Sequence, residues 1–329
     1  MDSQMDNMKN SKALEEFLIK AGKLSGKMDE KNEMSRELIE DAGDLGLLSR
    51  KPEGEEFYRT VVEIARRNQS LALSIVASSM VLVEFGDYTG RLHAFAVTEP
   101  ESGSDLKVCK TRIRNGKVYG VKTLITNAEL AEDFAVLAVD EDRDKLKLCL
   151  VERSGVSVRK LNVSSFRGSG IGVVRFEGAR VVDEADGLKA VMNTLNFSRP
   201  FFSAIALGIS ERCLEEAINY ARRRKAFGKP VLEYQGISFQ LAECVAEIEA
   251  LRALIEKAIK SRGETQISAI CKLFAAKTVK KVTDVCLQVI AGHGLVKGCY
   301  VERAYRDAKA FDVGEGTSEI MKLIISRSF

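Results

Sequence analysis

A single carboxylate lies between two glycines near the end of the chain, in Gly314-Glu315-Gly316. Because glycine lets the backbone approach a neighbouring molecule closely, a glutamate in this position can be held against a ligand. The same residues also fit an ordinary helix end followed by a helix start, with an incidental Glu. From this stretch alone the two interpretations are about equally supported.

The segments on both sides of Glu315 are predicted to be helical. Arg303, Arg306 and Asp307 recur three and four residues apart, which places them on one side of a helix. That helix is expected to break at the glycines, and Thr317 is expected to cap a new helix. The sequence therefore predicts the carboxylate at the joint of two helical segments.

Four further stretches could bind a ligand, although each has an ordinary structural explanation. Residues 98–105, TEPESGSD, could offer backbone N–H groups to a phosphate, or form a simple turn. Residues 122–127 are a strand ending in a hydroxyl and an amide, typical of a β-barrel edge. The Arg-rich segment 222–230 could bind a diphosphate or complement a helix dipole. The glycines in 288–294 could admit a cofactor or form a helix cap.

Composition excludes several classes of protein. A net charge of +3 is too small for a nucleic-acid-binding surface, and two histidines without HExxH or CxxC spacing make a metal site unlikely on sequence grounds. Seven scattered cysteines favour free thiols in a reducing compartment. We expect neither a signal peptide nor a membrane span, because the start is acidic and the apolar runs are short. The expectation is a soluble cytoplasmic protein.

Periodicity divides the 329 residues into three regions. Residues 1–91 show helical spacing and predict an N-terminal helical domain. Residues 92–186 contain short β-branched runs and an Asn115-Gly116 hairpin signal, which predict a middle β-barrel or sandwich domain. In residues 187–329 we expect long helices over 188–226, 234–262 and 266–291. With the shorter final unit they predict a C-terminal four-helix bundle.

Taken together and in this order, the motifs resemble the flavin-dependent acyl-CoA dehydrogenase family. They are TEPESGSDL, KTLITN, RRRKAFGKPVLEYQGISFQLAE, QVIAGHG, ERAYRDA and EGTSEI, and the resemblance covers roughly Phe95 to the C-terminus. The resemblance implies FAD as cofactor, an acyl-CoA substrate and a separate acceptor such as an electron-transfer flavoprotein. It also implies a homotetramer arranged as a dimer of dimers.

The resemblance assigns residues to the flavin by position. The contacts near the isoalloxazine and its phosphates fall on Phe95, Val97, Thr98, Gly103, Ser104, Leu124, Ile125 and Thr126. Among these, Thr126 matches the hydroxyl that bonds flavin N5, and Ser104 also lies near the CoA pyrophosphate. Leu124 replaces the family's usual aromatic residue, so the exposure or potential of the flavin is expected to differ.

Further residues are assigned to the rest of FAD and to the substrate. A neighbouring subunit is expected to contribute Arg224, Phe227, Gln235, Gln288 and Gly292, while Thr317 and Glu319 meet the adenosine diphosphate part. Substrate contacts are assigned to Ser104, Asn196, Arg199 and Gly316. The N-terminal helical region is shorter than the family's usual one, and Gly314 replaces a common Tyr, which predicts a wider pocket floor.

Glu315 matches the family's catalytic base. Formation of a trans-2-enoyl-CoA requires loss of an α-proton to a base and transfer of the β-hydrogen to the flavin. A carboxylate buried beside the thioester is expected to have a pKa raised from about 4.3 towards neutrality. The base's own N–H and a flavin hydroxyl would stabilise the developing enolate.

Two alternatives to this dehydrogenase remain. One is an acyl-CoA oxidase, or another flavoenzyme of the superfamily acting on a substrate that is not a CoA thioester. The other is a non-catalytic or nucleic-acid-associated flavoprotein of the same fold. The intact Glu315 and the near-neutral charge speak against the second.

Overall fold

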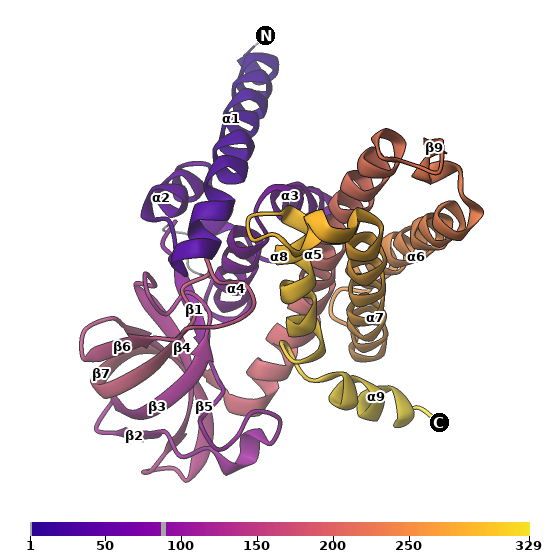
Figure 1. The fold of residues 1–329 in the computed structure, drawn as a ribbon. Helices are drawn as coiled ribbons and strands as arrows, with labels where there is room; N and C mark the ends of the chain where they lie inside the picture. Colours follow the sequence, from indigo (N-terminus) through magenta and orange to yellow (C-terminus); the bar gives the residue numbers. More distant parts are fainter. Residues whose placement is uncertain (1, 87–89) are drawn as a thin grey trace.

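A computed structural model describes residues 2–86 and 90–329. Four helices come first: α1 (Asp2–Lys31), α2 (Arg36–Asp44), α3 (Gly54–Arg67) and α4 (Gln69–Phe85). The Asn68 side chain caps α4 by accepting from Leu71 N, and Gly86 ends this helix in the left-handed conformation at φ +62°. The α4 helix, whose sequence is mostly apolar, is buried along most of its length, whereas α1 projects away from the rest of the chain (Figure 1).

Seven strands form the middle region. The hairpin predicted at Asn115-Gly116 is confirmed, with φ values of +49° and +68° at its two turn residues. The β4 strand pairs with β5, β5 with β7, β7 with β3, β3 with β2, and β2 again with β4, so the sheet closes into a barrel. The strands are β1 (His93–Ala96), β2 (Arg112–Arg114), β3 (Lys117–Ile125), β4 (Asp133–Asp140), β5 (Lys145–Glu152), β6 (Val156–Lys160) and β7 (Gly172–Asp186).

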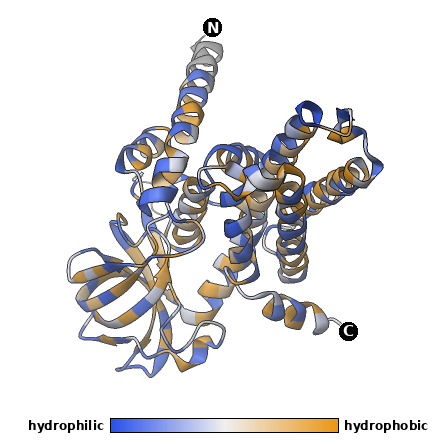
Figure 2. Cartoon of the chain, in the orientation of Figure 1, coloured by the Kyte–Doolittle hydropathy of each residue, from blue (hydrophilic) through white to orange (hydrophobic). Residues whose placement is uncertain are grey.

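Hydrophobic and hydrophilic residues alternate along these strands (Figure 2). The inward side chains, including Val118, Phe134 and Phe176, form a core inside the barrel. A second apolar cluster lies outside it, where Leu137 and Leu148 meet helical residues such as Val191. This outer cluster joins the barrel to the C-terminal helices.

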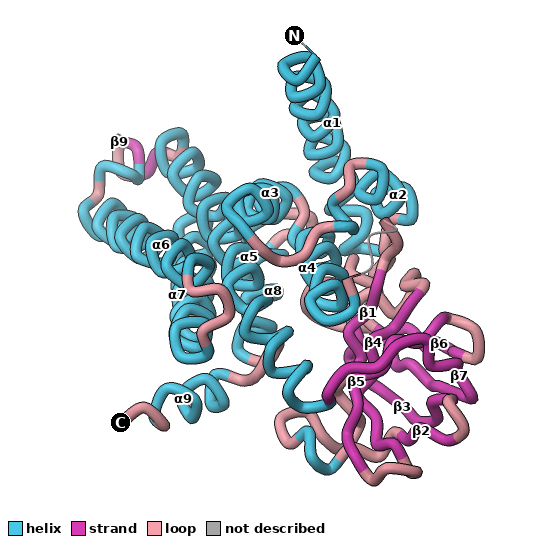
Figure 3. Tube along the Cα trace, turned by 180° about the vertical axis from the view of Figure 1, so that it is seen from behind, coloured by secondary structure: helices cyan, strands magenta, loops and turns pink. Residues whose placement is uncertain are grey.

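Long helices follow the barrel, close to their predicted bounds. They are α5 (Gly187–Arg223), α6 (Gln235–Lys260) and α7 (Thr265–Ile290), followed by the shorter α8 (Tyr300–Ala308) and α9 (Ser318–Ser326). The two-stranded β8 (Lys225–Ala226) and β9 (Lys229–Pro230) lie between α5 and α6. Seen from behind, strands β1 to β7 gather at the lower right, α1 and α2 lie above them, and α5, α6 and α7 lie to the left, with β9 beyond α6 (Figure 3).

The α5 helix is the central element, because it packs against α3, α4, α6 and α7. The N-terminal and C-terminal helices consequently share one hydrophobic core rather than two. The contact between α3 and α5 is close at Gly208, where an added Cβ would lie 2.5 Å from the carbonyl oxygen of Val62. Among the described residues, none of the helices has both the length and the apolar character that crossing a bilayer requires.

Candidate active site around Glu315

The turn that carries Glu315 begins where the helical segment after α8 ends. The short 3-10 helix η5 (Lys309–Asp312) leads into it, and Gly314 N donates to Ala310 O at 2.8 Å. Glu315 and Gly316 then have left-handed backbones, with φ values of +54° and +96°. The Thr317 hydroxyl accepts from Ile320 N and starts α9, as predicted.

The Glu315 carboxylate points to α5. Its Oε2 atom accepts a hydrogen bond from Ser198 Oγ at 2.8 Å. Burial raises the pKa of Glu315 to about 7, although the Ser198 hydrogen bond and the positive charges of Arg199 and Lys272 act in the opposite direction. A carboxyl with this pKa can accept a proton near neutral pH. Among the residues that the structure describes, no acceptor takes the backbone N–H of Glu315.

Two buried cations hold the backbone of the turn. Arg199 Nε donates to Glu315 O at 3.1 Å, and its NH1 donates to Asn196 Oδ1 at 2.9 Å. Lys272 Nζ donates to Gly316 O at 2.5 Å. The Arg199 side chain is 1% exposed, so in this chain it is enclosed behind the Glu315 turn. Asn196 is likewise buried and donates to Thr265 Oγ1.

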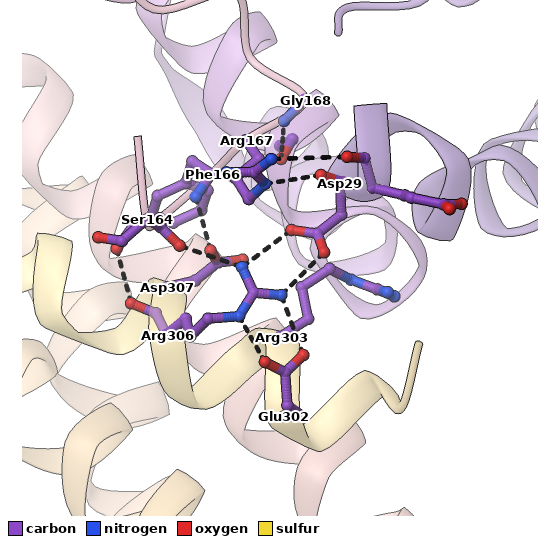
Figure 4. A network of polar contacts seen from close by, with 12 residues as sticks. Asp29, Ser164, Phe166, Arg167, Gly168, Glu302, Arg303, Arg306 and Asp307 are labelled. Atoms are coloured by element: carbon purple, nitrogen blue, oxygen red, sulfur yellow. Dashed lines mark hydrogen bonds and ion pairs between the residues drawn. The ribbon is translucent and has the colours of Figure 1, made fainter. Parts of the chain in front are cut away.

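The α8 helix, which precedes the turn, is fixed by a polar network (Figure 4). Arg306 forms ion pairs with Asp29 of α1 and with Glu302 one turn earlier. Asp307 Oδ1 accepts from Phe166 N at 2.6 Å, while its Oδ2 has no protein partner among the described residues. Burial raises the pKa of Asp307 to about 7. The predicted placement of Arg303, Arg306 and Asp307 on one helix is confirmed, and their contacts tie that helix to α1 and the barrel.

The residues assigned to the flavin ring gather at the ends of β1 and β3. Thr123 N donates to Thr98 O at 2.9 Å, which joins the two chain segments. Phe95 and Val97 pack in the same outer cluster as Leu195 of α5, one helical turn before Ser198. The structure therefore brings this group and Glu315 to the same end of α5.

The residues at the ends of β1 and β3 that are assigned to the flavin combine an exposed apolar side chain with partly exposed hydroxyls. Leu124 is 57% exposed and has a left-handed backbone (φ +56°), whereas Thr98 and Thr126 are half-buried. Ile125 is 2% exposed, so its side chain belongs to the barrel core and only its backbone could meet a ligand. Gly103 and Ser104 are exposed on the loop after β1.

A buried ion pair supports the loop after β1. Lys122 Nζ lies 2.8 Å from Glu99 Oε1 and also donates to Val97 O at 3.0 Å. Glu99 accepts further hydrogen bonds from Lys110 N and Thr111. Despite burial, hydrogen bonds from Lys122 and Thr111 lower the pKa of Glu99 to about 2. This pair fixes the backbone on both sides of Thr98.

The remaining assigned residues lie elsewhere. Arg224, Phe227 and Gln235 are exposed at the connection from α5 to α6, with Phe227 98% exposed. Gln288 and Gly292 are exposed at the C-terminal end of α7, where His293 stacks edge-on against Tyr220 of α5. Thr317 is half-buried as a helix cap, and Glu319 is exposed on α9. Arg224 follows Ser198 by 26 residues, or about 39 Å along α5, so this chain does not bring Arg224 to Glu315.

The sequence analysis did not single out Ser198, Lys272, Glu99 or Lys122. For Lys272 the sequence does contain a pattern that predicts burial. The residues three and four positions away on either side are small, and all are buried on the same side of α7: Ser268, Ala269, Ala275 and Ala276. A lone lysine among small residues at helical spacing indicates a buried cation. Ser198 had no comparable signal, because a serine in a helix is common.

Comparison with known proteins gives a consistent result. The family model "Acyl-CoA dehydrogenase, middle domain" matches residues 94–179, and "Acyl-CoA dehydrogenase, C-terminal domain" matches residues 185–329. The benzylmalonyl-CoA dehydrogenase of Aromatoleum aromaticum is 32% identical, with 91% of each chain aligned. An acyl-CoA dehydrogenase of Bacillus subtilis is 37% identical over 74% of this chain and 68% of its own length.

The solved structures agree with the sequence comparisons. Butyryl-CoA dehydrogenase from Megasphaera elsdenii superimposes with a TM-score of 0.88 at 26% identity, covering 98% of this chain and 97% of that one. A glutaryl-CoA dehydrogenase from Mycobacterium smegmatis, solved in complex with FADH2, has the same fold at 21% identity and a TM-score of 0.88, covering 98% and 94% of the two chains.

Proposed function

Because this chain belongs to the acyl-CoA dehydrogenase family, whose members are FAD-dependent oxidoreductases, we propose that it oxidises an acyl-CoA thioester to the trans-2-enoyl-CoA. Glu315 is the proposed base that removes the α-proton. The observation that carries this proposal is the position of the Glu315 carboxyl. The residue is half-buried at a turn, its carboxyl accepts a hydrogen bond from Ser198, and its pKa is raised to about 7.

The residues at the ends of β1 and β3 fit FAD. The exposed apolar side chain of Leu124 suits one face of a flat ring, and the hydroxyls of Thr98 and Thr126 suit its polar edge. Gly103 and Ser104 would face the phosphates, with Phe95, Val97 and the Ile125 backbone beside the ring. Bound there, FAD would supply the acceptor for the β-hydride.

The chain's own groups would then prepare the substrate. Arg199 and Lys272 fix the turn so that the Glu315 carboxylate has one position. The available N–H of Glu315 would donate to the thioester oxygen and stabilise charge that develops there after the α-proton leaves. Gly316 would allow close approach of the acyl chain, while Ser104, Asn196 and Arg199 are the proposed contacts nearer the CoA part.

Assembly is part of the proposal. Arg224, Phe227, Gln235, Gln288 and Gly292 lie far from Glu315 in one chain, so we infer that they contact FAD held by a second copy, in a homotetramer. The 98% exposure of Phe227 supports a partner at this end. Thr317 and Glu319 are the proposed contacts of this chain with the adenosine part. The proposed electron acceptor is an electron-transfer flavoprotein.

The proposed organisation and location follow from the same reading. We take residues 1–91, 92–186 and 187–329 as the domains, with α5, α6, α7 and the α8–α9 unit as a four-helix bundle. Secondary structure changes from helix to strand between Phe85 and His93 and back to helix at Gly187, which supports these domain bounds.

A cytoplasmic location is supported by the seven cysteines, all of which are free thiols. A role in β-oxidation of fatty acids is proposed on the family alone.

The test is anaerobic addition of acyl-CoAs of different length and branching to the purified yellow protein. Bleaching of the flavin and formation of the enoyl-CoA by mass spectrometry are expected. Glu315→Gln should keep its FAD and lose about 10³-fold or more in rate, while Glu40→Gln, at an exposed glutamate on α2, should not change either. Turnover by Glu315→Gln at the wild-type rate would remove Glu315 from the mechanism.

An acyl-CoA oxidase is the second candidate, favoured by one observation. Leu124 is 57% exposed, and as a smaller side chain than the family's usual aromatic residue it would leave room for oxygen beside the ring. Repeating the titration in air separates the two activities. Stoichiometric hydrogen peroxide without an added acceptor indicates an oxidase, and dependence on an electron-transfer flavoprotein indicates a dehydrogenase.

A further inference from the structure

Lys272 is a buried cation in the middle of α7. Its side chain is 1% exposed, among small residues that leave room for it. Its Nζ atom donates to the carbonyl oxygen of Gly316 at 2.5 Å. The contact is between a long helix and the residue directly after Glu315, so it acts on the turn that carries the carboxylate.

Arg199 makes the equivalent contact one peptide earlier. Its Nε atom donates to Glu315 O at 3.1 Å. Two consecutive carbonyls of a turn with φ values of +54° and +96° are therefore held by cations from two different helices, α5 and α7. A non-glycine residue such as Glu315 adopts this backbone only where the surroundings enforce it.

These cations are costly to bury. Within the described part of the chain, neither Arg199 nor Lys272 has a carboxylate within 4.0 Å. Burying a charge without an ion-pair partner costs free energy of folding. Stability alone therefore does not account for Lys272.

The charged groups around the turn come from every element packed on it. Arg199 (α5) and Lys272 (α7) act on Glu315, and Lys272 is also influenced by Asp312 (η5) and Glu319 (α9). Asp312 is engaged by other cations, Lys280 and Lys309. Burial lowers the pKa of Lys272 to about 8, and the negative charge of Glu315 is the largest effect opposing that shift. Lys272 and Glu315 therefore stabilise each other's charged forms.

We propose that Lys272 is a positioning residue for the reaction, which fixes the Gly316 carbonyl and, together with Arg199, holds Glu315 in its left-handed turn and favours its ionised form. This inference rests on the proposed role of Glu315 as the base. Lys272 itself touches neither substrate nor cofactor in this scheme, because its ammonium is enclosed and bonded to the turn.

Two variants of the holoenzyme separate charge from hydrogen bonding. Lys272→Gln keeps a donor near Gly316 but loses the charge, and Lys272→Met loses both. In both variants the pKa of Glu315 should rise by about one unit or more. Because Glu315 is about half ionised at pH 7, a rise of one unit should lower the rate at pH 7 about fivefold, and the rate should recover towards pH 9. At pH 9, Lys272→Gln should be faster than Lys272→Met, because only the latter loosens the turn.

The ionisation of Glu315 can be followed without measuring activity. The infrared band of its protonated carboxyl is assigned by its disappearance in Glu315→Gln and is then titrated in each Lys272 variant. Lys277→Met is the matched control, because Lys277 is an exposed lysine on the same helix. That control should leave the titration of Glu315 unchanged.

The outcomes distinguish this inference from the proposed function. An unshifted Glu315 band in both Lys272 variants would overturn the role of Lys272, whether or not Glu315 is the base. Full activity in Glu315→Gln would instead remove the base, while the infrared titration would still show whether Lys272 controls that carboxyl. If Lys272→Met does not fold, Lys272→Gln alone decides the charge effect.

Discussion

Ser198 and Glu315, which are 117 positions apart in the chain, form a 2.8 Å hydrogen bond between Oγ and Oε2. The same hydroxyl also lies 3.3 Å from Leu195 O one helical turn earlier. A serine has one proton and can accept as well as donate. When Glu315 is ionised, Ser198 donates to it; when Glu315 is protonated, Ser198 can turn its proton to Leu195 and accept. The pair thus accommodates both forms of a base.

Removing this hydroxyl is expected to shift the pH dependence of the rate. The Ser198 hydrogen bond lowers the pKa of Glu315. Ser198→Ala should therefore raise that pKa above about 7 and shift the acidic limb of the pH–rate profile to higher pH. The rate should drop several-fold at pH 6 and approach the wild-type value at pH 9. Ser210→Ala is a matched control, because Ser210 is also buried in α5 but donates only to Ala206 O. A uniform loss at all pH values would contradict the prediction.

The Glu99–Lys122 ion pair is expected to stabilise both the fold and the loop after β1, where FAD is proposed to bind. Removing one partner leaves a buried charge alone, so Lys122→Met should cost about 3–5 kcal/mol and lower FAD content. The double change with Glu99→Gln should recover part of this loss. Because the pKa of Glu99 is lowered to about 2, its contribution is present above about pH 4.5 and lost as the pH falls towards 2.

An exposed pair in the same barrel provides the comparison for Glu99. Glu141 and Arg114 form an ion pair at 2.5 Å on the surface, where such pairs contribute little. Glu141→Gln should therefore change the melting temperature only slightly and leave FAD content unaltered. An equal loss of stability in Glu141→Gln and Lys122→Met would show that burial does not matter here.

Asp307 is expected to make the protein less stable as the pH rises. Its pKa is raised to about 7 by burial, so the folded state keeps a proton that the unfolded state has lost above about pH 4. Stability is then lost as the pH rises from about 4 to 7. Asp307→Asn is always neutral, and its melting temperature relative to wild type should increase between pH 5 and pH 8.

A matched variant controls for general effects of pH on Asp307→Asn. Asp144 is exposed in the turn between β4 and β5 with φ +49°, a conformation that asparagine also tolerates. The Asp144→Asn variant shows how an Asp-to-Asn change at an exposed position behaves over the same pH range. If the Asp307→Asn difference from wild type is constant from pH 5 to pH 8, Asp307 is ionised in the folded protein throughout this range.

Arg224 is expected to act on a second copy of the chain. Arg224→Ala should reduce FAD content or shift the assembly towards smaller species, measured by absorbance and light scattering. Arg223 is the control, because it is adjacent, exposed and equally charged, and its Nε donates to Asn219 O within α5. Wild-type cofactor content and size in Arg224→Ala would argue against the contribution across subunits.

Local sequence determined the order of the elements and the position of the central turn. The glycines around Glu315 and the Thr317 cap are signals within a few residues of each other, and so is the Asn115-Gly116 hairpin; all were readable before the fold was known. Family motifs added FAD and the CoA thioester. These features depend on backbone preferences and spacing, which the chain carries regardless of its tertiary contacts.

Tertiary structure alone decided which groups control Glu315. Ser198, Arg199 and Lys272 come from α5 and α7, and only packing of those helices brings them to the turn before α9. Nothing in the sequence indicates that Arg199 also holds the backbone of Glu315, because that contact joins residues 116 positions apart. A raised pKa depends on exclusion of water and on charges from distant segments, so no local pattern could have specified it.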